Sequence, residues 1–203
     1  MAISEFKKMN TSKEKILDRS RPPRSGKPKD VNFPKFFESK TSNGITVLVI
    51  QDKRLPLISS RFVFKSGAYL DHFFGKEKYD LGSLTSEILT KGTESRNASQ
   101  IAEEIDFLGA SLSSGCTYDA TFVSSYSLKK YFGKVFDIMA DVILNPSFLE
   151  DELKRSSDQR LNSLLSMSDD GAYLADKTFS KYVFSKSPYS FPPEGESTSL
   201  KYI

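Results

Sequence analysis

Three polar side chains in one short segment, Ser83, Ser86 and Glu87, are the residues of this sequence best placed to do chemistry. Leucine and isoleucine recur around them at helical spacing, and residues four apart on a helix lie on the same side. Ser83 and Glu87 are therefore expected to lie on the same side of the helix. A serine hydroxyl is a poor metal ligand, and neither serine has an available base to activate it. The segment predicts neither a serine nucleophile nor a complete metal site.

The sequence contains a single histidine, His72, and a single cysteine, Cys116. A catalytic zinc site typically needs three protein ligands, mostly histidine with glutamate, aspartate or cysteine. No short metal-ligand spacing is present, so such a site would have to converge from distant positions. We expect His72 to face solvent from the polar loop 71–75, and Cys116 to be a small, half-buried thiol near a strand end. The acidic pairs 103–104 and 169–170 are interpreted as solvated helix faces.

The composition describes a soluble globular chain of 203 residues, of which 38% are hydrophobic and 27% charged. Its net charge of +3 is uneven, because residues 1–30 hold nine Lys and Arg against four Asp and Glu. The remainder carries about −2 by subtraction, which gives no reason to expect a nucleic-acid surface. No apolar run approaches the length of a membrane span, and one cysteine excludes a disulfide within the chain.

Two segments differ in composition. Residues 1–30 are basic and contain prolines and few apolar side chains, so they are predicted to form a flexible lead-in, with a folded domain over 31–203. The first ten residues lack the apolar stretch of a signal peptide. This favours the cytoplasm by default, whereas a trimmed or misplaced start would allow a periplasmic protein.

Periodicity predicts the secondary structure. Strands are expected at 36–40, 45–50 and 57–65, arranged as a meander whose first turn is Asn43-Gly44, and again at 110–114 and 121–128. Helical spacing predicts helices at 81–91, at 97–108 with Asn97 as its cap, at 132–144, from Ser147 or Glu150 to about 165, and at 172–183. Strands joined by hairpins and followed by helices predict an α+β fold, a mainly antiparallel sheet packed against several helices.

Several motifs, in order along residues 34–203, resemble those of the inverted-motif zinc peptidases: insulinase, pitrilysin and the mitochondrial processing peptidase. Active members of this family carry H-x-x-E-H on a helix that runs into a K-G-T turn. The matching segments are Thr41–Val47, Lys91-Gly92-Thr93, Leu108–Leu112, Asp141–Phe148 and the loop Ser187-Pro188-Tyr189-Ser190, where Ser187 replaces a histidine.

The resemblance implies that the catalytic residues are missing. Counting back from the K-G-T turn, Ser83 and Glu87 take the two histidine positions and Ser86 takes the position of the catalytic glutamate. The third ligand of the family is a glutamate on a later helix, and its position falls at about Asn162 or Ser163. We therefore expect a catalytically inactive domain without zinc, with zinc present only in an active partner.

The closest likeness is to paired bacterial proteins, in which one chain carries the zinc motif and the other has lost it. This implies a hetero-oligomer with a zinc-bearing subunit that helps to enclose an unfolded peptide. In the family, the strand equivalent to 110–115 takes up extended substrate as an added β-strand. Ser111, Leu112, Ser113 and Ser114 are accordingly candidate peptide-binding residues. Alternatively, that edge is covered by a partner or by a further part of the protein.

Family protomers consist of two similar domains, and these 203 residues match only the first. We therefore expect an incomplete domain with the second domain absent. Two other functions stay open: an active zinc metalloendopeptidase whose ligands are assigned wrongly here, and a free-standing peptide-binding module. The lone histidine weighs against the first, and a missing H-x-x-E-H partner would favour the second.

Overall fold

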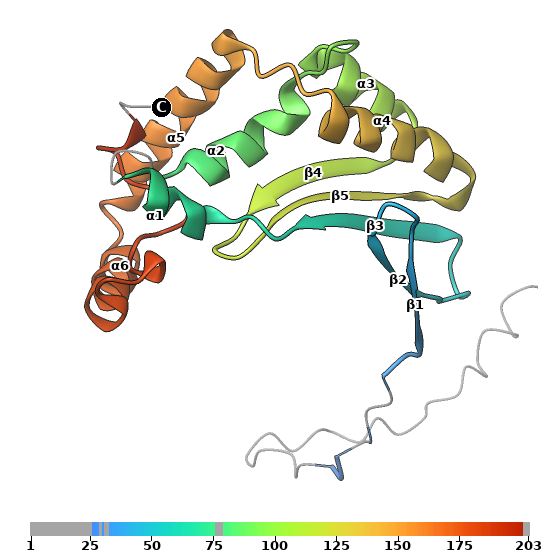
Figure 1. Cartoon of the computed structure of the whole chain (residues 1–203), viewed down its shortest axis with the longest axis horizontal. Coiled ribbons are helices and arrows are strands. Elements are labelled where there is room, and N and C mark those ends of the chain that lie inside the picture. Colours follow the sequence, from blue (N-terminus) through green and yellow to red (C-terminus); the bar gives the residue numbers. More distant parts are fainter. Residues whose placement is uncertain (1–25, 29, 31–32, 76–78, 201–203) are drawn as a thin grey trace, which may run out of the picture. The chain divides into compact units, whose positions relative to one another are not determined.

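The computed structural model describes residues 26–28, 30, 33–75 and 79–200, and it divides into two compact units, Met1–Asp52 and Lys53–Ile203. The predicted lead-in, residues 1–30, lies almost entirely outside the described residues. The elements of both units are labelled in Figure 1.

The first unit contains a hairpin of two antiparallel strands, β1 (Phe36–Lys40) and β2 (Thr46–Ile50). Gly44 adopts φ +89° in the connecting turn, a conformation that glycine reaches without a Cβ clash. Its N–H donates to the carbonyl of Thr41 at 3.0 Å, and the N–H of Thr41 donates to the carbonyl of Ile45 at 3.0 Å. The hairpin predicted from Asn-Gly is confirmed.

The second unit is built on an antiparallel three-stranded sheet with the order β3-β5-β4. These strands are β3 (Leu57–Phe64), β4 (Ser111–Cys116) and β5 (Thr121–Leu128). Within this unit β3 pairs with β5, a strand that lies far from it in sequence. Turn signals predict pairing between neighbours in sequence, whereas pairing between distant strands is decided by what the sheet packs against.

The helices of the second unit follow the predicted order, with one addition. Their bounds are α1 (Asp71–Phe74), α2 (Leu81–Ile88), α3 (Ala98–Phe107), α4 (Phe132–Leu144), α5 (Glu150–Met167) and α6 (Gly171–Phe184). The predicted loop at His72 is wrong, because α1 forms there and the His72 ring is half-buried, with Nδ1 3.4 Å from the Tyr79 hydroxyl. No helix within the described ranges is both long and apolar enough to cross a membrane.

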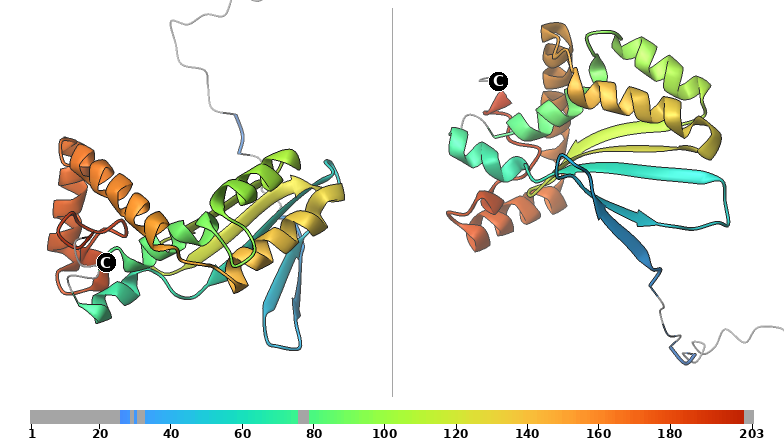
Figure 2. Two further views of the ribbon diagram at one scale, coloured as in Figure 1. Left: turned by 90° about the horizontal axis from the view of Figure 1, so that it is seen from above. Right: turned by 45° about the vertical axis from the view of Figure 1, so that its right-hand side comes forward.

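The helices α2, α3 and α4 cover one face of the sheet, as the views in Figures 1 and 2 agree. Asn97 and Gln100 form the predicted capping box at the start of α3, and Gly109 follows its end with φ +57°. Apolar residues at helical spacing bury the facing sides of α3 and α4. They are Ile101, Ile105, Leu108, Val135, Ile138 and Val142. The fold is α+β, as predicted.

A polar network anchors α4 to the turn that precedes α3. The carboxylate of Asp141 accepts hydrogen bonds from Asn145 at 2.9 Å, Thr93 at 2.8 Å, Ser95 at 3.0 Å and Arg96 at 2.6 Å. Burial raises the pKa of Asp141, but these donors outweigh burial and lower it to about 2. The ionised carboxylate therefore holds the start of the α3 segment against the end of α4.

Candidate functional site

The helix that carries the degenerate motif, α2, begins against a buried carboxylate. Asp71 accepts hydrogen bonds from the backbone N–H of Asp80 at 3.2 Å and of Gly82 at 3.0 Å. These are orphan donors of the first helical turn, so Asp71 caps α2 from another element. Asp80 itself adopts φ +99°, a strained conformation for a residue with a side chain. A methyl group at Gly82 would lie 3.3 Å from the Asp71 carboxylate, so a side chain there would press against this cap.

The guanidinium of Arg160, on α5, lies between the residues at the two histidine positions. Its Nη1 donates to the Ser83 hydroxyl at 3.0 Å and to Asp80 at 3.0 Å, and its Nη2 donates to Glu87 at 2.5 Å. Ser83 and Glu87 thus lie on the same side of α2, one helical turn apart, as the spacing predicts, and both contact Arg160. The Arg160 side chain is 15% exposed and that of Glu87 is 32% exposed. A permanent cation therefore occupies the space between α2 and α5.

These residues do not fit a zinc ion. A tetrahedral site needs several His, Cys or carboxylate ligands that point at one empty centre. Here the only carboxylate at a motif position, Glu87, is paired with Arg160, so a metal ion would compete with a fixed positive charge. Asn162 and Ser163 are exposed, and the Ser163 hydroxyl donates to a carbonyl of its own helix at 3.0 Å. In the described part of the chain, no three His, Cys, Asp or Glu residues form a metal-binding group.

Ser86 links α2 to the sheet. Its hydroxyl donates to the carbonyl of Ser83 at 2.7 Å, and its own carbonyl accepts from the Ser114 hydroxyl of β4 at 2.6 Å. The side chain is buried within the helix layer. Ser86 therefore has a packing role in this geometry, and none of its hydrogen-bond partners is a base that could activate it.

Burial dominates the electrostatics of Asp80. Its side chain is fully buried. Oδ1 accepts from Arg160, whereas Oδ2 has no hydrogen-bond partner among the described residues. Burial raises the pKa of Asp80 to about 8, against the opposing effect of Arg160 and with added repulsion from Asp71, Glu87 and Glu194. Asp80 is thus a carboxyl group that the fold holds largely protonated near neutral pH.

The segment after α6 closes over this carboxyl group. Gly195, with φ +77°, lies so near that a Cβ there would be 2.3 Å from the Cβ of Asp80. The Phe191 ring stacks on Tyr79 with centroids 4.0 Å apart. In the loop that resembles H-P-Y-G, Tyr189 donates to Asp119 in the β4–β5 turn. Phe191 and Gly195 thus cover the start of α2, whereas Tyr189 contacts the turn between β4 and β5.

Sequence reasoning missed Arg160, Asp80 and Asp71. The available signal was a basic residue just before the expected third ligand, on a helix facing two acidic positions of the motif segment. Because opposite charges facing each other across helices tend to pair, this pattern could have indicated an ion pair. No local signal in the sequence indicates the cap that Asp71 provides, because Asp71 lies nine residues before Asp80, at the start of the helix.

The predicted peptide-binding residues lie on an outer strand, because β4 pairs with β5 alone among the described strands. Their side chains alternate between the two faces of the sheet. Leu112 packs against the helical core and Ser114 bonds to α2, whereas Ser111 and Ser113 are exposed on the opposite face. The backbone edge of β4, not a cluster of side chains, is therefore the feature that could bind a peptide.

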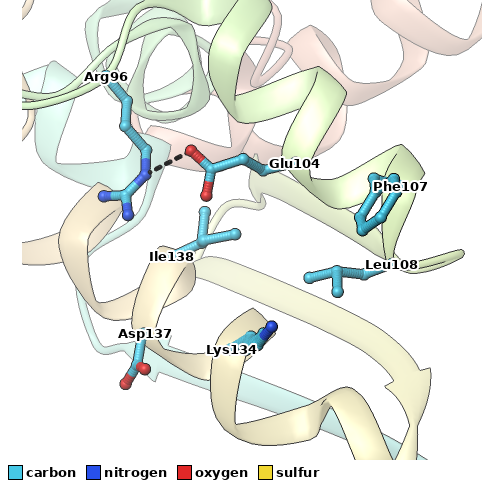
Figure 3. Close-up of a pocket in the computed structure, with 7 residues that line it drawn as sticks. All are labelled: Arg96, Glu104, Phe107, Leu108, Lys134, Asp137 and Ile138. Carbon is cyan, nitrogen blue, oxygen red and sulfur yellow. Dashed lines mark hydrogen bonds and ion pairs between the residues drawn. The ribbon is translucent and has the colours of Figure 1, made fainter.

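One shallow pocket, of about 250 Å³, lies elsewhere, between α3 and α4 (Figure 3). Its lining residues are Arg96, Glu104, Phe107, Leu108, Lys134, Asp137 and Ile138. Figure 3 shows the ion pair of Arg96 with Glu104, 3.1 Å long, at one side of this pocket. This pocket is not lined by any of the residues that the motif predicts.

A family model described as insulinase, peptidase family M16, matches residues 77–183. The chain belongs to this family. Among curated relatives, a protein named an uncharacterized zinc protease from Rickettsia felis is 27% identical over 165 residues. That match covers 81% of this chain and 39% of the relative. The predicted family resemblance is confirmed, and the chain spans about two fifths of the length of the curated relatives that it matches.

Solved structures of the insulinase family share the fold. The crystal structure of a peptidase M16 inactive domain from Pseudomonas fluorescens superposes with a TM-score of 0.76 at 24% identity, covering 83% of this chain and 40% of that one. Pitrilysin superposes with a TM-score of 0.68 at 19% identity, covering 84% of this chain and 18% of its own. At these identities the likeness concerns the fold.

Proposed function

We propose that this insulinase-family domain is non-catalytic, that it binds extended peptide at the edge of β4, and that it pairs with a zinc-bearing family subunit. The observation that carries the proposal is the contact of Arg160 with both Ser83 and Glu87. A guanidinium cannot activate water as a zinc ion does, and it is never deprotonated in a protein. With Ser86 at the position of the base, the family's hydrolysis has no residue to perform it.

Peptide binding does not require the lost side chains. A strand that joins a sheet edge is held by main-chain hydrogen bonds, and β4 offers such an edge. The Ser114 hydroxyl fixes β4 to α2 at 2.6 Å, so the strand is held firmly by the helix layer. The proposal of pairing draws support from the Pseudomonas fluorescens neighbour, which is itself described as an inactive domain.

The catalytic part of the proposal is tested on the purified, folded chain by metal analysis together with cleavage of unfolded casein. We expect no stoichiometric zinc and no cleavage above background. Stoichiometric zinc, together with cleavage that a zinc chelator abolishes, would overturn the proposal and support an active metalloendopeptidase. The Arg160→Ala variant serves as a control, because removal of the guanidinium alone supplies no histidine ligand and should not create activity.

Pairing is tested by affinity capture of the chain from its native cell extract, followed by mass spectrometry. We expect a protein that carries H-x-x-E-H in near-equal amount, which would also identify the enzyme that this domain serves. Recovery of no such protein with a folded bait contradicts the pairing and favours a free-standing peptide-binding module. Peptide binding itself is measured separately, as described below.

A further inference from the structure

The sheet of the second unit has an open face. The helices α2, α3 and α4 lie on the other face, and no helix of the described residues of this unit crosses the open one (Figure 1). The strand register aligns Arg61, Ser124 and Ser113 in one row across β3, β5 and β4 on this face. Arg61 and Ser113 are both exposed. The row runs from β3 to the outer edge of β4.

The Arg61 side chain is held in place and directed toward β4. Its Nε donates to the Ser124 hydroxyl at 2.8 Å, and its guanidinium carbon lies 4.7 Å from the centroid of the Phe122 ring. That ring lies over Gly115 of β4, where a Cβ would be 2.7 Å from its Cζ atom. The guanidinium therefore lies over β5, and the outer strand β4 is the next strand, roughly 4.8 Å further on. Stacking and a hydrogen bond together orient it before any ligand arrives.

The charge of Arg61 is not neutralised within this face. None of the residues of β3, β4 and β5 is aspartate or glutamate. Arg96, Arg155 and Arg160 each pair with a carboxylate, whereas Arg61 forms no ion pair with any described residue. Because Nε is bonded to Ser124, both terminal nitrogens of Arg61 are left for a ligand. A fixed guanidinium with two such donors matches the two oxygens of a carboxylate.

We propose that Arg61 is a specificity residue, which selects an acidic side chain in an extended peptide paired with the outer edge of β4. This inference rests on the peptide binding proposed above. A strand added to β4 places every second side chain on the face of Ser113. A glutamate at such a position reaches back across β4 toward the guanidinium, and the Ser113 hydroxyl can donate to the same carboxylate.

The experiment uses fluorescein-labelled dodecapeptides of alternating serine and threonine, with a single central Glu, Gln or Lys, and measures anisotropy with the full chain. We expect the Glu peptide to bind about fivefold to tenfold more tightly than the Gln peptide at low salt, and the difference to shrink as salt rises. Arg61→Gln should abolish this preference, and Arg61→Glu should reverse it in favour of the Lys peptide. Arg155→Gln is the matched control, because Arg155 is an exposed arginine on α5 that pairs within its own helix.

The outcomes separate this inference from the function on which it rests. Equal binding of Glu and Gln peptides, or a Glu preference that survives in Arg61→Gln, contradicts the role of Arg61 and leaves peptide binding intact. Absence of binding for all three peptides to a chain shown to be folded by circular dichroism contradicts peptide binding, and the role of Arg61 with it. Loss of the preference in Arg155→Gln as well would show a general charge effect and would also overturn the role of Arg61.

Discussion

Two aspartate–arginine pairs lie at different places in the helix layer, and they differ in how their carboxylates are satisfied. Asp141 pairs with Arg96 at 2.6 Å and accepts hydrogen bonds from three further side chains. Asp80 pairs with Arg160 at 3.0 Å, and no group in the described part of the chain donates to its Oδ2 atom. The pKa of Asp141 is lowered to about 2, whereas burial raises that of Asp80 to about 8.

The difference shows that an arginine partner alone does not keep a carboxylate ionised. Burial disfavours the charged form of both groups, and several hydrogen bonds are needed to outweigh it. At Asp141 the donors are sufficient, and the network stabilises the fold. At Asp80 the nearby Asp71 and Glu87 add repulsion, so Arg160 compensates only in part. Strain and incomplete satisfaction of this kind are concentrated at functional sites, and here they adjoin the motif helix.

The largest effect on stability is expected at Asp141, whose carboxylate accepts hydrogen bonds from four side chains. Asp141→Ala removes the acceptor for four donors, three of which belong to the turn before α3, and should lower the free energy of unfolding by about 2–3 kcal/mol. Urea unfolding followed by circular dichroism measures this change. Asp137→Ala on the same helix is the control, since Asp137 is exposed and should cost no more than about 0.5 kcal/mol. Equal losses in the two variants would contradict the role of the network.

A smaller effect on stability is expected at the pair of Asp80 and Arg160. Arg160→Met should lower the free energy of unfolding by roughly 2 kcal/mol at pH 7, because Asp80 can hold a proton instead of remaining as an unpaired charge. Without the guanidinium the pKa of Asp80 rises further, so the loss should widen above pH 8. Thermal unfolding at pH 7 and pH 9.5 tests this, with Arg155→Met as the control. A loss independent of pH would count against a protonated Asp80.

The pH dependence should run in opposite directions for the two carboxyl groups. Asp80 has a folded-state pKa of about 8 against 3.8 for the free group, so its contribution to stability is complete below about pH 4 and is lost as pH rises through 8. Asp141 contributes above about pH 4, and its contribution is lost as pH falls through 2. Urea unfolding of Asp80→Asn at pH 5, 6.5 and 8 should show a flatter profile than the original chain. If stability depends on pH in the same way in Asp80→Asn as in the original chain, Asp80 is not the group with the raised pKa.

No effect is expected from metal removal. Because Arg160 and not a metal ion joins α2 to α5, a zinc chelator should leave the melting temperature of the folded chain unchanged, as should added zinc. Differential scanning fluorimetry with and without chelator makes the measurement. A fall of several degrees in the melting temperature on chelation would indicate a structural metal. It would contradict the conclusion that Arg160 alone joins α2 to α5.

Much of the local structure follows from local signals. Asn43-Gly44 predicted the hairpin turn, and Asn97, Gln100 and Gly109 predicted both ends of α3. The signals failed where tertiary contacts decide. The α1 helix at His72 was predicted as a loop, because its short polar and aromatic run has no helical periodicity. The pairing of β3 with β5, a partner that is far away in sequence, had no local signal either.

The family, the residues at the motif positions and, apart from α1, the order of strands and helices follow from the sequence, since they depend on residue types and short spacings. The sequence also placed Ser83 and Glu87 on one side of a helix. What they face depends on tertiary packing, because α5 brings Arg160 to them from a distant part of the chain. The same is true of Arg61, whose partners Ser124 and Phe122 are set by the sheet register. Side chains far apart in sequence meet only when strands and helices pack, and that packing is a collective property of the core.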